Sequence, residues 1–208
     1  EYLSDDWFDC INACVDEGKK TGMESWCYDE NGWPSGFGGG IVNGLGLEYQ
    51  QKYLRWRKIS SADLAGAEHK IAVYSLDCKR ISEEEAKTQS EILLFYFDVN
   101  PYYVDTLDRK VTEKFLEVTH QEYFNRLSES ERKEMQGFFT DEPQISRNGI
   151  PWSFIYESEY RAAYDEELLD VLPALFFKTD RFERTRWRFW RLTTRLFMNN
   201  FMKPIHDW

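Results

Sequence analysis

The sequence predicts an α/β fold that contains part of a (β/α)8 (TIM) barrel, interrupted by a β-rich insertion. Two segments repeat one order, in which a helix leads to a short hydrophobic strand and the strand ends in an acidic loop. Alternation of helices with strands of about five residues implies a parallel sheet with helical crossovers. Between the two segments the hydrophobic period changes from that of helices to that of strands, which marks the insertion.

The first segment consists of an N-terminal helix and the strand 23–28. Ser4 is a suitable helix N-cap, and Gly22 follows two lysines in the position of a normal helical stop. The strand ends directly before Asp29 and Glu30, which open a loop rich in glycine and proline. The first acidic pair therefore follows the carboxyl end of a predicted strand.

The insertion covers residues 47–104. Residues 71–76 and 91–99 are predicted to be the strands of a hairpin, with the polar stretch 82–90 as a long connection. The insertion is shorter than most independent domains, so we expect it to interrupt a single domain. Its three consecutive parts are residues 1–46, 47–104 and 105–208.

The second segment repeats the order of the first. Helical periodicity over 105–127 leads to the strand 135–139, which ends in a loop that carries Asp141 and Glu142. Two further helices are predicted, one capped by Ser153 and ending near residue 171, the other over residues 180–202.

The two acidic pairs indicate a function. In parallel sheets of this kind, functional groups collect at the carboxyl ends of the strands. Carboxylates from two strand ends that converge on one cleft suit glycoside hydrolysis, where one protonates the leaving oxygen and the other activates water or attacks the sugar. Trp33 and Trp152 lie a few residues beyond the pairs and are suitable sugar-stacking platforms. The alternative is that these carboxylates only cap helices or lie in solvated loops.

Composition excludes several classes of protein. The chain of 208 residues carries a net charge of −11, with 42% hydrophobic and 17% aromatic residues. It is too hydrophobic for a disordered acidic chain and too acidic for a non-specific nucleic-acid binder. A mean hydropathy of −0.64 and the lack of an apolar run near about 18 residues exclude a membrane span. We therefore expect no nucleic-acid and no membrane partner.

Cysteine and histidine give weaker signals. Four cysteines are too few for a disulfide scaffold of this size, so we expect buried free thiols in a reducing cytoplasm. Cys10 and Cys14 lie one helical turn apart, but no second pair completes a metal site. A divalent ion held by Asp29 and Asp141 stays open as an alternative. His120 lies on a semi-apolar helix face and is either a structural residue or a substrate contact.

The last predicted helix carries a row of arginines. Arg181, Arg184, Arg188, Arg191 and Arg195 follow one another at steps of three and four and share one helical face. Interleaved aromatic residues make RNA binding one interpretation. The favoured interpretation is that these arginines pair with the acidic remainder of the chain or form the solvated side of an outer barrel helix. In that case the aromatic residues are expected to face inward.

Four stretches of the sequence resemble glycoside hydrolases related to the α-L-rhamnosidase family 106. The combination of Y-D-E and W-P-S-G with a distant T-D-E-P is more specific than either motif alone. The four stretches are Glu1–Ser4 with the following helix, Gly22–Gly36, Gly137–Gln144 and Pro151–Phe176. Together they cover most of the chain outside the insertion.

The resemblance implies a (β/α)8 catalytic domain that cleaves rhamnosides or related sugars. It makes Glu142 the candidate general acid, with Asp141 orienting it or binding sugar. Asp29 and Glu30 are implied to contact sugar or to position water, which makes Glu30 the second catalytic candidate. Calcium is a candidate cofactor, because some members of the family use it.

The chain also departs from the family pattern. Where the family has T-H-E-x-Y, this chain has Gln121 in place of the glutamate. Relatives are expected to extend beyond both ends, so the remainder of the catalytic domain is an expected partner and this segment alone is expected to be inactive. The alternative function is a non-catalytic sugar-binding or scaffolding part of a larger carbohydrate-active protein.

Overall fold

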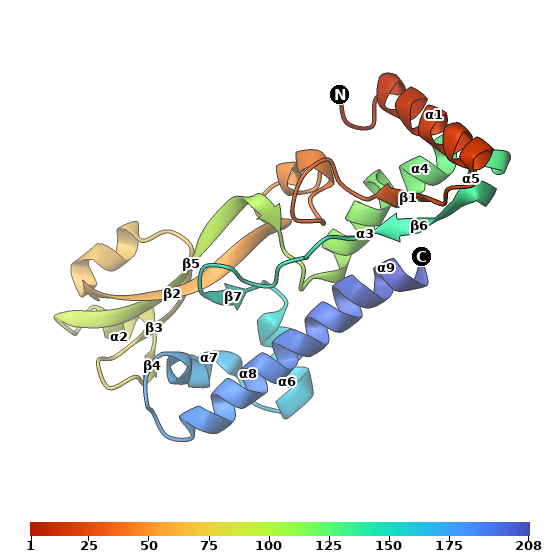
Figure 1. The fold of residues 1–208 in the computed structure, drawn as a ribbon. Coiled ribbons are helices and arrows are strands. Elements are labelled where there is room, and N and C mark those ends of the chain that lie inside the picture. The colour runs from red at the N-terminus through yellow and green to blue at the C-terminus, as the bar shows by residue number, and fades with distance from the viewer. The chain divides into compact units, whose positions relative to one another are not determined.

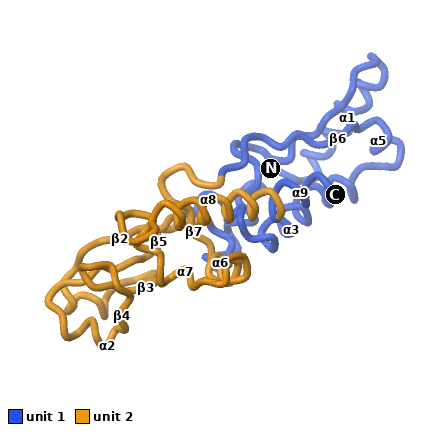
Figure 2. Tube along the Cα trace, turned by 90° about the horizontal axis from the view of Figure 1, so that it is seen from below, with its two compact units in different colours: residues 1–50, 101–144, 200–208 blue, residues 51–100, 145–199 orange.

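The computed structural model describes residues 1–208 and divides them into two compact units (Figure 2). Unit 1 contains residues 1–50, 101–144 and 200–208, and unit 2 contains residues 51–100 and 145–199. Each unit is therefore assembled from stretches that are separated in the sequence. The division into three consecutive parts stays a prediction.

Unit 1 is mostly helical (Figure 1). Its helices are α1 (Asp5–Thr21), α3 (Arg109–Val118), α4 (His120–Arg126), α5 (Glu129–Glu134) and α9 (Lys203–Asp207), and its strands are β1 (Ser25–Tyr28) and β6 (Met135–Phe139). Helix α1 confirms the predicted signals, since the Ser4 hydroxyl accepts a hydrogen bond from the Trp7 amide and Gly22 adopts the left-handed conformation. Two short 3-10 turns, Gly38–Gly40 and Asn43–Leu45, follow β1.

Strands β1 and β6 pair in parallel, as the sequence predicts. Cys27 lies opposite Phe138, and both pack toward the helices in a cluster with the buried Phe8 and Tyr123. Because side chains alternate along a strand, the neighbouring residues point to the other face. There Trp26 is exposed and lies against Gly137.

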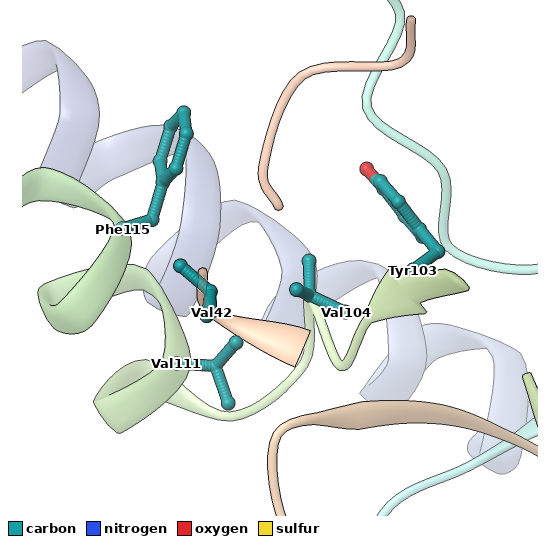
Figure 3. Packing of buried hydrophobic residues seen from close by; sticks show 5 residues of the cluster. All are labelled: Val42, Tyr103, Val104, Val111 and Phe115. Atoms are coloured by element: carbon teal, nitrogen blue, oxygen red, sulfur yellow. The ribbon is translucent and has the colours of Figure 1, made fainter. Parts of the chain in front are cut away.

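A second cluster forms the apolar core beside the glycine-rich stretch 36–46, which we call the glycine loop (Figure 3). Five buried residues from the loop, the end of strand β5 (Glu91–Val104) and helix α3 form it: Val42, Tyr103, Val104, Val111 and Phe115. The predicted helix over 105–127 is broken into α3 and α4 at Thr119, whose backbone leaves the helical region at φ −115° and ψ −82°. The break gives His120 a position at the start of a new helix.

Unit 2 contains a five-stranded sheet and the long helix α8 (Figure 1). The strands are β2 (Gln50–Ser60), β3 (Lys70–Tyr74), β4 (Arg80–Ile81), β5 (Glu91–Val104) and β7 (Ile150–Trp152), in the order β4-β3-β5-β2-β7. The helices are α2 (Glu83–Ala86), α6 (Tyr156–Tyr164), α7 (Leu168–Val171) and α8 (Phe182–Phe197), with 3-10 turns at Ser61–Gly66 and Leu172–Leu175. A π-helical turn, Met198–Met202, leads from α8 to α9.

The predicted hairpin is confirmed. Strands β3 and β5 pair antiparallel, with Val73 opposite Leu94. Both side chains belong to an apolar cluster that also contains Leu64 and Ile92. The polar connection between the strands contains α2, which begins with a capping box formed by Ser82 and its partner three residues later. The β-rich region therefore has its own core.

The predicted (β/α)8 barrel is wrong. The molecule has a mixed α/β fold with a two-stranded parallel sheet and a separate five-stranded sheet whose described pairings are antiparallel, and no barrel closes. The helix-strand order predicted one parallel pair correctly. The error arises after Pro143, where Pro151 and Trp152 form strand β7 and pair antiparallel with β2 instead of leading into a crossover helix.

Two other details differ from the sequence analysis. Ser153 does not cap a helix, because α6 begins at Tyr156 after Ile155 and the Ser153 hydroxyl has no hydrogen-bond partner. The four cysteines are free, but Cys10 and Cys14 are exposed on α1 instead of buried. No helix of the structure combines the length and the apolar character needed to cross a membrane.

Candidate functional site

The carboxylate site consists of Asp29, Glu30, Asp141 and Glu142, all in unit 1. The two pairs follow the carboxyl ends of β1 and β6, and the parallel pairing places these ends side by side because Tyr28 lies opposite Phe139. The loops that begin here are also joined, since the Asp29 amide donates to the Phe139 carbonyl at 3.3 Å. The pairing of the two strands therefore brings the two predicted acidic loops together.

Asp29 is fully buried, and hydroxyl groups satisfy both of its carboxylate oxygens. Ser35 Oγ donates to Oδ1 and Thr140 Oγ1 donates to Oδ2, each at 2.6 Å. Burial raises the pKa of the Asp29 carboxyl, although the two hydroxyl donors favour the charged form and oppose the rise. Asp29 thus links its own loop to the loop after β6.

Glu30 is also buried, and its carboxylate organises the glycine loop. The backbone amides of Gly36, Gly38 and Gly39 donate to it, at 3.2 Å from Gly36 and 2.8 Å from Gly39. Burial raises the pKa of Glu30 to about 7, against the opposing effect of these three donors. Gly38 and Gly39 have φ near +60°, a conformation that turns the amides inward and that favours glycine.

Reciprocal hydrogen bonds join Ser35 to Asp141. The Ser35 amide donates to the Asp141 carbonyl at 2.9 Å, and the Asp141 amide donates to Ser35 Oγ at 2.8 Å. Tyr103 supports the same connection, because its hydroxyl donates to the Ser35 carbonyl and accepts from the Gln144 amide. Ser35 is therefore a buried residue that joins the two acidic loops.

The second acidic pair has a different environment from the first. Asp141 is half-buried, whereas Glu142 is exposed and its side chain forms no hydrogen bond or ion pair. The Glu142 backbone has φ +39°, an uncommon conformation for a residue other than glycine. Trp33 lies in the adjoining loop and is 43% exposed. The outer side of the site thus offers an accessible carboxylate and an accessible aromatic ring.

His120 lies in the interior behind Asp29. Its Nε2 is 3.7 Å from Asp29 Oδ2 and has no hydrogen-bond partner, while Nδ1 is 2.9 Å from Thr119 Oγ1. Burial lowers the pKa of His120 to about 4, so the ring is neutral near pH 7. Its ring packs against Phe138 and Trp208, with centroids 4.3 and 5.2 Å away. The His120 side chain is 1% exposed. Its contact with a substrate stays a prediction.

Trp152 belongs to unit 2 and is not an exposed platform. It is 3% exposed, and its ring packs against Tyr156 with centroids 5.7 Å apart. Trp26 and Phe139, on the outer face of the parallel strands, are 60% and 56% exposed. Neither ring was among the predicted site residues, because both belong to short hydrophobic strands and the predicted aromatic platforms were placed in the sequence beyond the acidic pairs.

The residues present do not fit a calcium ion. No group of three or more His, Cys, Asp or Glu side chains is placed to hold a metal. Calcium binds through several oxygen ligands, most often carboxylates. Here the Asp29 oxygens accept from hydroxyl groups and the Glu30 oxygens accept from amides, so the buried pair is already satisfied without a cation.

Three residues of the network were not among the predicted site residues: Ser35, Thr140 and Tyr103. Ser35 and Thr140 lie in the same two motifs as the acidic pairs, so the motifs W-P-S-G and T-D-E-P contained the signal. Tyr103 lies at the end of the β-rich region, and no local pattern links it to the loops. No family model, no curated protein and no solved structure matches the chain. The resemblance to the rhamnosidase family therefore stays an expectation.

Proposed function

We propose that unit 1 carries the catalytic carboxylates of a glycoside hydrolase, with Glu142 as the general acid. One observation supports this above all: Glu142 is the third residue after the end of β6, is exposed, and lies in a loop that is hydrogen-bonded to the loop after β1. A general acid must reach the leaving oxygen of a bound substrate, and a rigid support holds it within reach.

The four carboxylates then divide into two layers. Asp29 and Glu30 form the inner layer, which fixes the loops through hydroxyl and amide donors. Asp141 and Glu142 form the outer layer, where Asp141 is the nearest carboxylate to Glu142 along the chain. We therefore assign Glu30 to positioning and Asp141 to the second carboxylate role, in which it orients the acid or activates water.

Exposed aromatic rings support a carbohydrate as the substrate. Trp33 lies in the loop after β1, and Phe139 directly precedes the loop that carries the outer layer. An aromatic face buries the apolar face of a sugar ring without needing a hydrogen bond. Rhamnosides and related deoxy-sugars are the first substrates to test, because the sequence resemblance implies them.

Hydrolysis of aryl glycosides tests the proposal, with the chain and with any longer natural polypeptide that contains it. Glu142→Gln should lower turnover by a factor on the order of 10² or more, because glutamine cannot transfer a proton. Glu134→Gln is the matched control, since Glu134 lies at the other end of β6 and pairs with Lys19. Equal turnover of Glu142→Gln and the control would remove Glu142 from the role.

The second candidate is a sugar-binding module without catalysis. The observation that favours it is that backbone amides already bind the Glu30 carboxylate. Only the second acidic pair is then available to a ligand. This candidate predicts no hydrolysis by any form of the protein but measurable binding of oligosaccharides that is lost in Trp33→Ala. Hydrolysis that depends on Glu142 excludes it.

A further inference from the structure

Helix α8 exposes an arginine and tryptophan face that the proposed function does not use. Arg184, Trp187 and Arg191 follow one another at steps of three and four residues and are all exposed. Trp187 is 59% exposed, and the Arg191 guanidinium lies over its ring at 5.1 Å from the centroid. The opposite face of α8 is buried through residues such as Phe189 and Leu192. The exposed row is therefore a stripe on one side of a well-packed helix.

The arginines of this stripe have no acidic partner within unit 2. The ion pairs of the α8 region involve Arg181, which contacts Asp180, and Arg188, which contacts Glu166. Arg184, Arg191 and Arg195 form none. The sequence analysis predicted that these arginines pair with acidic residues elsewhere in the chain. Arg188 does so through Glu166, whereas Arg184, Arg191 and Arg195 do not.

Helix α1 exposes a face of opposite charge. Asp9, Ala13 and Asp16 are exposed and share one side of α1, about 100° around the helix axis from the buried Phe8 and Val15. Neither Asp9 nor Asp16 forms an ion pair, whereas Asp5 pairs with Arg126 and Glu17 pairs with Lys20. The centre of the face holds a small residue between two carboxylates that form no ion pair.

The two faces match in an antiparallel register. Going up α8, the order is Arg184, Trp187 and Arg191, at steps of three and four. Going down α1, Asp16, Ala13 and Asp9 follow at the same steps. Each arginine then comes opposite a carboxylate and the large tryptophan comes opposite the alanine. Each stripe spans about 10 Å at 1.5 Å per residue, so the pairs meet along two full turns.

We propose that α8 of one copy of this chain docks antiparallel on α1 of a second copy. Charge complementarity supports this partner: unit 1 has 21 acidic and 9 basic residues, a formal charge of −12, while unit 2 has 16 acidic and 17 basic residues, a charge of +1. A contact between two different faces is heterologous. Each copy can therefore bind one neighbour through α8 and another through α1. Exposed ion pairs are individually weak, so the association is concentration-dependent and sensitive to salt.

Sedimentation equilibrium of the intact chain over a range of concentrations tests the proposal. Self-association is expected at about 0.1 M salt and should weaken at least tenfold at about 1 M, where the Debye length falls from about 10 to about 3 Å. The double variant Arg184→Asp/Arg191→Asp should weaken association at least tenfold at low salt. Asp9→Arg/Asp16→Arg should do the same, because each variant places like charges opposite one another.

A mixing experiment separates docking from unfolding. The two double variants, each weakened alone, should associate with one another, because the reversed α8 of the first matches the reversed α1 of the second. Arg57→Asp/Lys79→Asp is the control, since it makes the same charge change on exposed residues elsewhere in unit 2 and should leave association unchanged. Circular dichroism melting verifies that all variants remain folded.

Three results would overturn the proposal. The first is a chain that stays monomeric at every concentration. The second is a pair of reversed variants that do not associate on mixing. The third is binding of a single-stranded RNA probe through Arg184 and Arg191 by a monomeric chain, which would assign the stripe to nucleic acid.

Discussion

Unit 1 and unit 2 differ in what they bury. Unit 1 buries three carboxylates, Asp29, Glu30 and Asp105, and carries the acidic charge of the chain. Unit 2 buries no carboxylate, and its apolar cluster is built from residues such as Ile92 and Leu94. Burial of a charged group is costly unless hydrogen bonds compensate it. Unit 1 meets this cost at carboxylates, two of which organise the acidic loops through hydroxyl and amide donors. The buried charged side chain of unit 2 is Lys52, whose ammonium group lies over the Phe154 ring.

The largest expected effect concerns Asp29. Asp29→Ala leaves the hydroxyls of Ser35 and Thr140 without their acceptor and should lower the free energy of unfolding by about 3–5 kcal/mol. Urea denaturation measures the change. Asp98→Ala in unit 2 is the control: Asp98 is exposed and pairs with Arg55, so its loss should cost about 1 kcal/mol or less. Similar losses in both variants would contradict the contrast between the units.

The next effect is a pH dependence that two residues of unit 1 make in opposite directions. The pKa of Glu30 in the folded protein is about 7, above its ordinary value of 4.5. The contribution of Glu30 to the free energy of unfolding therefore falls as pH rises from about 4.5 to 7. The pKa of His120 in the folded protein is about 4, below its ordinary value of 6.5. The contribution of His120 to the free energy of unfolding therefore rises as pH rises from about 4 to 6.5. Each contribution is about 3 kcal/mol at full extent, and they largely cancel.

Single substitutions should reveal the two slopes. Glu30→Gln should make the free energy of unfolding rise more steeply with pH between about 4 and 6.5, because the opposing contribution of Glu30 is removed and that of His120 remains. His120→Gln should make it fall between about 4.5 and 7. Denaturation curves at several pH values measure the slopes, which are independent of any constant loss of stability. Equal slopes in the two variants would show that neither group titrates as described.

A smaller effect is expected in the glycine loop. Gly39 has φ +62°, its amide donates to Glu30, and an added Cβ would lie 2.6 Å from the Tyr2 ring. Gly39→Ala should therefore cost about 2 kcal/mol or more. Gly44→Ala is the matched control, because no atom lies within 4 Å of an added Cβ and its φ is ordinary. A difference of less than about 0.5 kcal/mol between the two would indicate that Glu30 does not need this loop geometry.

The smallest effect lies in unit 2. The Tyr53 hydroxyl donates to Gln51 Oε1 at 2.6 Å, and Asn100 donates to the same oxygen at 3.0 Å. Tyr53→Phe leaves that acceptor satisfied, so it should cost about 1 kcal/mol, with no dependence on pH between about 4 and 8. A pH-dependent loss measured by the same denaturation curves would place a titrating group in unit 2 and remove the distinction.

The sequence predicts the local elements of the carboxylate site but not the way the chain connects them. Ser4, Gly22 and the strand 135–139 carry local signals, namely a cap, a left-handed stop and a short apolar run, so their elements are confirmed. The barrel is wrong because parallel pairing of two strands does not determine the path of the chain beyond them. Pro151 and Trp152 join the antiparallel sheet through contacts with β2, about 100 residues earlier in the chain, and no local pattern encodes that pairing.

The prediction of the site shows the same limit. Placing two acidic pairs at strand ends was sufficient to bring them together, because parallel pairing aligns those ends. Their different burial could not be predicted, since it depends on the Glu30 contacts with three glycine amides and on Tyr103 from a distant strand. The environments of Glu30 and Glu142 therefore differ, although both residues follow strands of similar sequence pattern.

The interleaving of the two units has a consequence for folding. Asp29 and Thr140 are 111 residues apart in the chain, and closing a loop of that length costs about 4 kcal/mol of chain entropy. The β3–β5 hairpin of unit 2 closes a far shorter loop. During synthesis the chain therefore completes the hairpin while the first acidic loop still lacks its partner, and pulsed hydrogen exchange should find β3 protected before β1. The carboxylates acquire their burial, and their shifted proton affinities, only when the second loop arrives.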